Sequence, residues 1–211
     1  MRLSFPWRTL SGAFVLLLAL PAMAGEASVF PLMHRWAHIN YRMHGEAQEA
    51  AFAALADDAA GLAETHPRNA EVLTWQGIIL ASEAGARGGL GALDLAKQAR
   101  DVLERAIDID PQGDNGSAYV TLGTLYARVP GWPIGFGDDE RAGRLLKKAV
   151  AIRPEGIDTL YFYAAFLHDQ GRDQAALDLA LRARRAPDRP GREASDTGLR
   201  EAIGHLVAEL R

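Results

Sequence analysis

Apolar residues beyond the N-terminal region recur at intervals of three and four, the period of a helix with one buried face. Tyr119, Leu122, Gly123 and Tyr126, with offsets of three, four and seven from the first, lie on one helix face. Alternation of apolar and polar residues is nowhere sustained long enough to predict a strand. Proline and glycine fall between the periodic segments. The pattern therefore predicts an all-α chain.

The helical pattern repeats about three times along the chain. Each unit has a first helix with large and small apolar residues, a second helix rich in alanine, and a stop. The stops are Pro111, Pro154 and Asp188, and Asp188 occupies the position where the other two units have proline. Because small residues let two helices approach closely, Gly77 and Gly123 are expected at contacts between paired helices.

This order of large and small residues, closed by proline, resembles the tetratricopeptide repeat (TPR) family. The resemblance implies a right-handed superhelical array of antiparallel helix pairs. It covers residues 70–188. Residues 25–69 are expected to form a degenerate repeat, and residues 189–211 a C-terminal capping segment with a helix over 193–210. The array would end in this helix because an uncovered last repeat would expose its apolar face.

By the same resemblance, the first helices line a concave groove. The groove would take Thr74, Ile78, Val120, Thr124, Arg128, Tyr161 and His168. Apolar and aromatic groups there would bury a partner segment or an apolar small molecule, and Arg128 would pair with an acidic group on it.

Two units carry insertions between their helices, ten residues in the first and seven in the second relative to the compact third unit. Such insertions gather on one face of an array, often the binding face. The first, Ser82 to Leu93, is rich in glycine. The second, Val129 to Gly137, is apolar and interrupted by proline and glycine, and Asp138 or Asp139 would cap the helix after it.

Trp132 and Phe136 of this second insertion have two open interpretations. They fold back to fill the gap between helices, or they form a contact lip for a partner or ligand. The Pro-Gly-Trp-Pro segment is similar to the TPR-like periplasmic T component associated with TRAP transporters, which is thought to engage a substrate-binding protein. Members are often lipid-anchored through cysteine, and this chain has none.

The N-terminus has the pattern of a secretory signal peptide. Arg2 and Arg8 precede the short apolar run of residues 13–20, and Ala22-Met23-Ala24 supplies a small-x-small cleavage site. We expect cleavage after Ala24 and a periplasmic protein that is not held in the membrane. Cleavage removes two arginines and no acid, which leaves a net charge of −6. Such a chain, without a basic run, argues against nucleic acid as a partner.

Candidate chemistry is sparse. His34, His38 and His44 cluster near the start, but no carboxylate joins them at suitable spacing before Glu46, so no metal site is predicted. Asp114 or Asn115 is expected to cap the next helix rather than to bind calcium. Thiol chemistry is excluded because the chain lacks cysteine.

The sequence therefore predicts a non-enzymatic binding module that needs no cofactor. Its partner would be a protein or an apolar small ligand, and it could act as an accessory to a transporter. A structural scaffold of an envelope complex is the alternative, a hydrolase is a third, and association into a homo-oligomer stays open.

Overall fold

The computed structural model describes residues 28–89 and 91–211, and the expected signal peptide lies outside them. These residues form nine α-helices and no strand. The helices are α1 (Phe30–Arg42), α2 (Gly45–Thr65), α3 (Ala70–Arg87), α4 (Gly91–Ile109), α5 (Ser117–Arg128), α6 (Asp139–Ile152), α7 (Ile157–Asp169), α8 (Asp173–Arg184) and α9 (Glu193–Glu209). The predicted all-α class is confirmed.

Helix starts follow the sequence at two places and depart from it at a third. The side chain of Asp138 accepts a bond from Arg141 N–H before α6, as predicted. Asn69, a residue type that favours helix starts, accepts one from Val72 N–H before α3. The predicted cap of α5 is wrong. Gly116 precedes α5 with φ of 89°, and Asp114 and Asn115 form a left-handed turn ahead of it. Two successive residues with positive φ cannot be helix caps of the ordinary extended type.

The glycine-rich first insertion is mostly helix rather than loop. Its residues up to Arg87 continue α3 by more than a turn, because alanine, glutamate and arginine favour helix and one interior glycine is tolerated. Gly88, with φ of 64°, then ends the helix, and α4 starts at Gly91. The extra length therefore extends the two helices rather than a binding loop.

Small residues stand where paired helices touch, as the repeat pattern predicts. A Cβ placed on Gly123 of α5 would lie 2.8 Å from Cγ of Leu146 on α6. The equivalent point on Gly77 of α3 would lie 2.5 Å from Cγ of Leu103 on α4. The facing alanines of the second helices, among them Ala99 and Ala142, are fully buried. Close backbone approach is thus the basis of packing within each unit.

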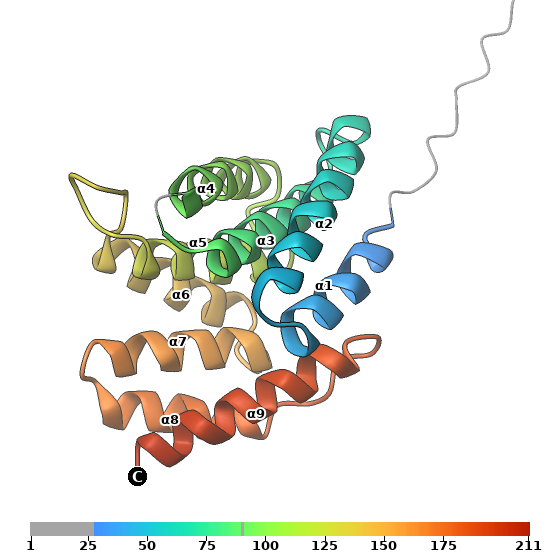
Figure 1. Cartoon of the computed structure of the whole chain (residues 1–211). Helices are drawn as coiled ribbons and strands as arrows, with labels where there is room; N and C mark the ends of the chain where they lie inside the picture. The colour runs from blue at the N-terminus through green and yellow to red at the C-terminus, as the bar shows by residue number, and fades with distance from the viewer. Residues whose placement is uncertain (1–27, 90) are drawn as a thin grey trace, which may run out of the picture.

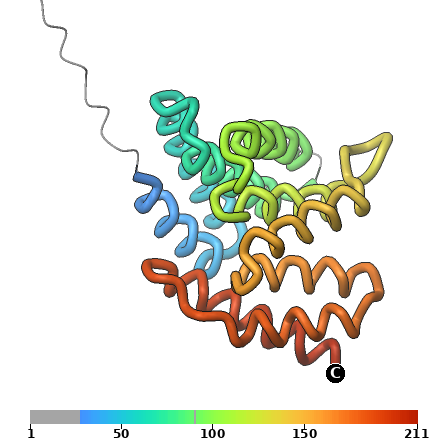
Figure 2. Tube along the Cα trace, turned by 180° about the vertical axis from the view of Figure 1, so that it is seen from behind, coloured from blue at the N-terminus to red at the C-terminus, as the bar shows by residue number. Residues whose placement is uncertain are grey.

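The odd-numbered helices form a closed inner ring. Each contacts the next, from α1 to α3, α5, α7 and α9, and α9 returns to contact α1. The even-numbered helices α2, α4, α6 and α8 pair with their predecessors on the outside. Figures 1 and 2 show the first and last described helices side by side from opposite directions. The array thus curls until its ends meet.

A glycine on α9 lets the two ends approach. Gly198 lies against the ring of Tyr41 on α1, so close that a Cβ there would overlap the ring. Tyr41 in turn packs edge-on against Trp36, with ring centroids 5.8 Å apart. The helix predicted as a cap therefore also closes the ring. No helix within the described part of the chain is apolar over a length that would cross a membrane.

The contact between α5 and α6 gives a test of the helix register. Gly123→Leu should lower the free energy of unfolding by about 1–3 kcal/mol or more, because the added side chain overpacks the space taken by Leu146. Gly61 on α2 has open space around its Cβ position, so Gly61→Leu is the matched control and should not destabilise the protein. Urea unfolding of both variants measures the difference. Equal stabilities would contradict the close approach of α5 and α6.

Candidate functional site

A cavity of about 720 Å³ lies inside the ring of odd-numbered helices. Its walls come from α1, α3, α5, α7 and α9, with the start of α4 and the second insertion at one end. This volume is in the range of sites that hold small molecules. We refer to it as the ring pocket.

The ring pocket is elongated along α3 and α5. At one end the lining includes Trp75 and Ser117, near the starts of these helices. At the other end it includes Gly85 and Arg128, near their ends. Ten residues of helix rise about 15 Å, which sets the approximate length of the pocket.

Most of the pocket wall is apolar. The apolar side chains are contributed chiefly by α3, α4, α5 and the second insertion. They include Ile78, Ala81, Ala92, Leu93, Ala96, Val120, Leu125, Val129, Pro130 and Ile134. A wall of this kind favours an apolar ligand, because burying apolar surface releases it from water.

The end near Trp75 and Ser117 holds a network of buried ion pairs. Asp158 at the start of α7 accepts bonds from Arg153 at 2.5 Å and from Arg189 at 2.9 Å. Arg189 also donates to Asp196 of α9 through Nε at 2.8 Å and through its backbone N–H at 2.7 Å. The network therefore ties the end of α6, α7 and α9 together at the floor of the ring pocket.

Charge within this network outweighs the cost of burial. Burial raises the pKa of Asp158, but the guanidinium groups of Arg153 and Arg189 more than offset this, and the pKa of Asp158 falls below its usual value. Burial lowers the pKa of Arg189, yet Asp158 and Asp196 raise it overall. Both shifts favour the charged forms of Asp158 and Arg189, and the two groups are bonded to each other.

Arg192 differs from these arginines because no carboxylate in the described residues pairs with it. It lines the ring pocket, and its guanidinium lies over the ring of Trp75, 5.0 Å from the centroid. Burial lowers the pKa of Arg192, and the neighbouring charge of Arg189 lowers it further. A half-buried cation on an aromatic ring is a ready partner for an anionic group.

Asp114 lies within electrostatic reach of Arg192. Its Oδ2 is buried without a hydrogen-bond partner in the described residues. Burial raises the pKa of Asp114 to about 6, with Glu71 adding to the rise, while Arg192 and Arg153 oppose it. Near neutral pH Asp114 is therefore mostly ionised, and it loses its charge in mildly acidic solution.

Four of the seven predicted groove residues line the ring pocket: Ile78, Val120, Thr124 and Arg128. The other three are not among the lining residues. Thr74 is fully buried in the core, because Trp75 rather than Thr74 faces the pocket. Tyr161 packs against Phe162 and the core that α7, α8 and α9 share. His168 bonds to Asp173 at the turn between α7 and α8.

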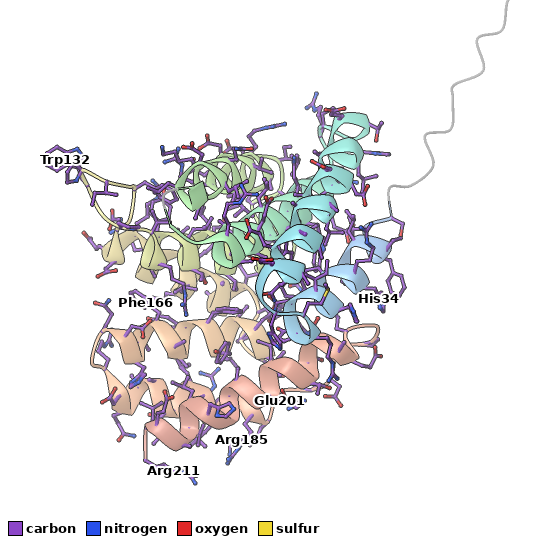
Figure 3. The ribbon with its side chains drawn as sticks, in the orientation of Figure 1. His34, Trp132, Phe166, Arg185, Glu201 and Arg211 are labelled. Carbon is purple, nitrogen blue, oxygen red and sulfur yellow. The ribbon has the colours of Figure 1, made fainter. Side chains whose placement is uncertain are left out.

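The two aromatics of the second insertion separate. Phe136 folds back onto Tyr126, with ring centroids 5.3 Å apart, and Arg100 lies 4.7 Å above its ring. Trp132 at the tip is 90% exposed and points away from the body of the molecule (Figure 3). The residues of this insertion that line the pocket are Val129, Pro130 and Ile134. Phe136 is thus the packing residue, and Trp132 does not fill a gap.

Backbone bonds close the neck of this loop. Gly137 N–H donates to the carbonyl of Pro130 at 3.0 Å, and Asp138 N–H donates to that of Tyr126 at 2.9 Å. A Cβ on Gly135 or Gly137 would meet backbone atoms across the neck, so only glycine fits there. The neck fixes where Ile134 enters the pocket.

Sequence reasoning did not identify the polar end of the pocket. Arg189, Arg192 and Tyr41 lie outside the region that resembles TPR units, at the two ends of the chain that meet when the ring closes. The signal that was available is the pair of arginines just before a helix start in a segment with proline and glycine. That signal by itself does not indicate where the arginine side chains point.

The predicted absence of a metal site concerned the histidines near the start of the chain. His34 packs against Phe30, with ring centroids 4.1 Å apart. No group of three metal-ligating side chains occurs in the described residues.

The fold is similar to that of known TPR proteins. A thermophilic TPR protein from Thermus thermophilus, TTC0263, is 18% identical, with a TM-score of 0.57 over 85% of this chain and 89% of that chain. MamA is less similar, with 15% identity and a TM-score of 0.46 over 78% of this chain and 90% of that chain. No family model matches the sequence, and no curated protein matches it significantly. The fold is therefore an all-α TPR-like helical array.

The loop yields a paired test. Phe136→Ala should lower the free energy of unfolding by about 2 kcal/mol, since it removes a half-buried ring from Tyr126 and Arg100. Trp132→Ala should change stability by less than about 0.5 kcal/mol, because the side chain is exposed. Thermal and urea unfolding of both variants measure the effects. A large loss for Trp132→Ala would contradict the exposed position of this residue.

Proposed function

We propose that this protein is an exported, non-enzymatic binding module that holds an apolar small molecule in the ring pocket. The observation that carries the proposal is a largely apolar cavity surrounded by a closed ring of helices. Open TPR arrays offer a groove along which a peptide can run. Here the contact between α9 and α1 closes that groove and leaves a compartment.

The shape and chemistry of the lining support a small molecule over an extended peptide. A cavity of about 720 Å³ takes a ligand of ordinary small-molecule size. Side chains rather than backbone strand edges form its wall, so main-chain pairing of a peptide would gain nothing there. The second insertion covers one end through Pro130 and Ile134.

We place this activity in the periplasm because residues 1–24 have the pattern of a cleaved signal peptide. The similarity of the Pro-Gly-Trp-Pro segment to the T component of TRAP transporters supports a role as an accessory to a transporter. A module that holds an apolar molecule outside the inner membrane suits such a role.

A protein contact is a second candidate, and the loop tip favours it. Trp132 is 90% exposed and Ile134 is 63% exposed, on a neck closed by backbone bonds. Exposed aromatic side chains on a preformed loop are typical of contact sites for other proteins. This contact and the ring pocket could serve one partner, with the loop on the protein surface and the pocket holding its ligand.

Filling the pocket tests the leading proposal. The purified protein should bind the uncharged apolar dye N-phenyl-1-naphthylamine, and Thr124→Trp should weaken this binding at least about tenfold by occupying the pocket. Lys147 is exposed on α6 and does not line the pocket, so Lys147→Trp is the matched control and should bind as the unchanged protein does. Equal binding by all three proteins would place the dye elsewhere and remove the ring pocket from the proposal.

Export has its own test. Protein recovered from the periplasmic fraction should begin at Gly25, because the Ala22-Met23-Ala24 segment directs cleavage after Ala24. N-terminal sequencing gives the answer directly. Ala24→Leu is the control and should slow processing, since a large residue blocks the cleavage site. A periplasmic form that still begins at Met1 would rule out the cleaved signal peptide.

A further inference from the structure

We propose that the ligand of the ring pocket is an amphipathic acid, whose apolar body lies along α3 and α5 and whose anionic group binds Arg192. This inference rests on the proposed function, because it concerns the ligand of the same pocket. The chemical class is a small-molecule carboxylate with an apolar chain or ring.

The charges at the floor of the pocket point to Arg192. Asp158 and Asp196 are both occupied by Arg189, and Asp158 also binds Arg153. The network therefore has no carboxylate left for Arg192 among the described residues. A buried or half-buried cation without a partner is costly, and an anion from a ligand would reduce that cost.

The surroundings of Arg192 suit an anion that arrives from the apolar side. The ring of Trp75 lies beneath the guanidinium, 5.0 Å from its central carbon, and attracts the cation. Ser117, Ser195 and Asn40 line the same end and can donate hydrogen bonds to an oxyanion. The apolar wall begins beside them with Ile78 and Val120. The carboxylate of such an acid would thus bind the guanidinium and the hydrogen-bond donors, and its apolar chain would lie along the apolar wall.

Arg128, the cation predicted from the sequence to bind an acid, lies at the other end of the pocket. It is exposed at the end of α5, so water weakens its attraction for an anion. Arg192 is half-buried, and a charge pair gains more where the effective dielectric constant is lower. The pair of arginines therefore offers a matched comparison of an inner and an outer cation.

Asp114 tunes the strength of this site. The charges of Arg189, Asp158, Asp114 and Arg153 all act on Arg192. Glu71 and Asp110 act on Asp114, whose buried Oδ2 has no hydrogen-bond partner among the described residues. The negative charge of an ionised Asp114 partly neutralises Arg192 and so weakens the attraction of Arg192 for an acid ligand. Asp114→Asn should therefore strengthen the binding of an acid near neutral pH, and asparagine suits the positive φ of 49° at this position.

Competition against N-phenyl-1-naphthylamine tests the proposal with two probes that share one alkyl chain, decanoate and 1-decanol. The unchanged protein should bind decanoate at least about tenfold more tightly than decanol, as expected for a hydrogen-bonded charge pair. Arg192→Gln should remove this preference and leave decanol binding within about twofold. Arg128→Gln should keep the preference. Arg192→Lys should retain part of it, which guards against a change in folding, and circular dichroism melts check each variant.

The outcomes separate this inference from the proposed function. Equal affinity for decanoate and decanol would overturn the acid ligand and leave the apolar pocket intact. Failure of the dye and both probes to bind would overturn both. Loss of the preference in Arg128→Gln instead of Arg192→Gln would move the anion to the rim. A short apolar peptide with a free C-terminal carboxylate that competes better than decanoate, and does so only when it is not amidated, would replace the small molecule with a peptide end.

Discussion

Closure of the helix array at the junction of α1 and α9 is the constraint on which the rest of the structure depends. The junction requires a glycine, because Gly198 has no Cβ to keep α9 away from the ring of Tyr41. Next to this junction, Arg189 joins Asp158 of α7 to Asp196 of α9. Without this closure the inner helices would line an open groove. With it they enclose a compartment whose floor is ionic and whose walls are apolar.

The ion-pair network at the pocket floor and the close helix contacts are expected to respond differently to mutation. Where Gly123 meets Leu146, the packing is apolar and local, and its loss is expected to disturb neighbouring units of the array. The network of Arg153, Asp158 and Arg189 is largely buried, so removal of Asp158 would leave the charge of Arg153 without its carboxylate partner. Such a network is weak evidence of stability by itself. Its position at the meeting point of three helices suggests that it sets their relative placement.

Two surfaces of the molecule bear on binding, and they have different characters. The ring pocket is concave and apolar with a cation at its inner end, a combination suited to a small molecule that has both an apolar and an anionic part. The tip of the second insertion is convex, and its neck is held by backbone bonds. A module with both surfaces could present a bound ligand and contact a protein through one end of the same pocket, because Ile134 belongs to the tip and to the lining.

The sequence by itself determined the helices, their pairing and four of the residues that line the pocket. Helical periodicity and the placement of small residues are properties of a single unit. The contacts of Gly77 and Gly123, and the position of Ile78 and Val120 on the inner face, could therefore be predicted from the sequence of each unit. The tertiary structure alone decided that the array closes, because curvature accumulates over all units and no single unit encodes it. Closure brought Arg192 over Trp75, residues more than a hundred positions apart in the chain. A sequence does not show where the side chain of a loop arginine points. For Arg192 this is decided only when the two ends of the array meet.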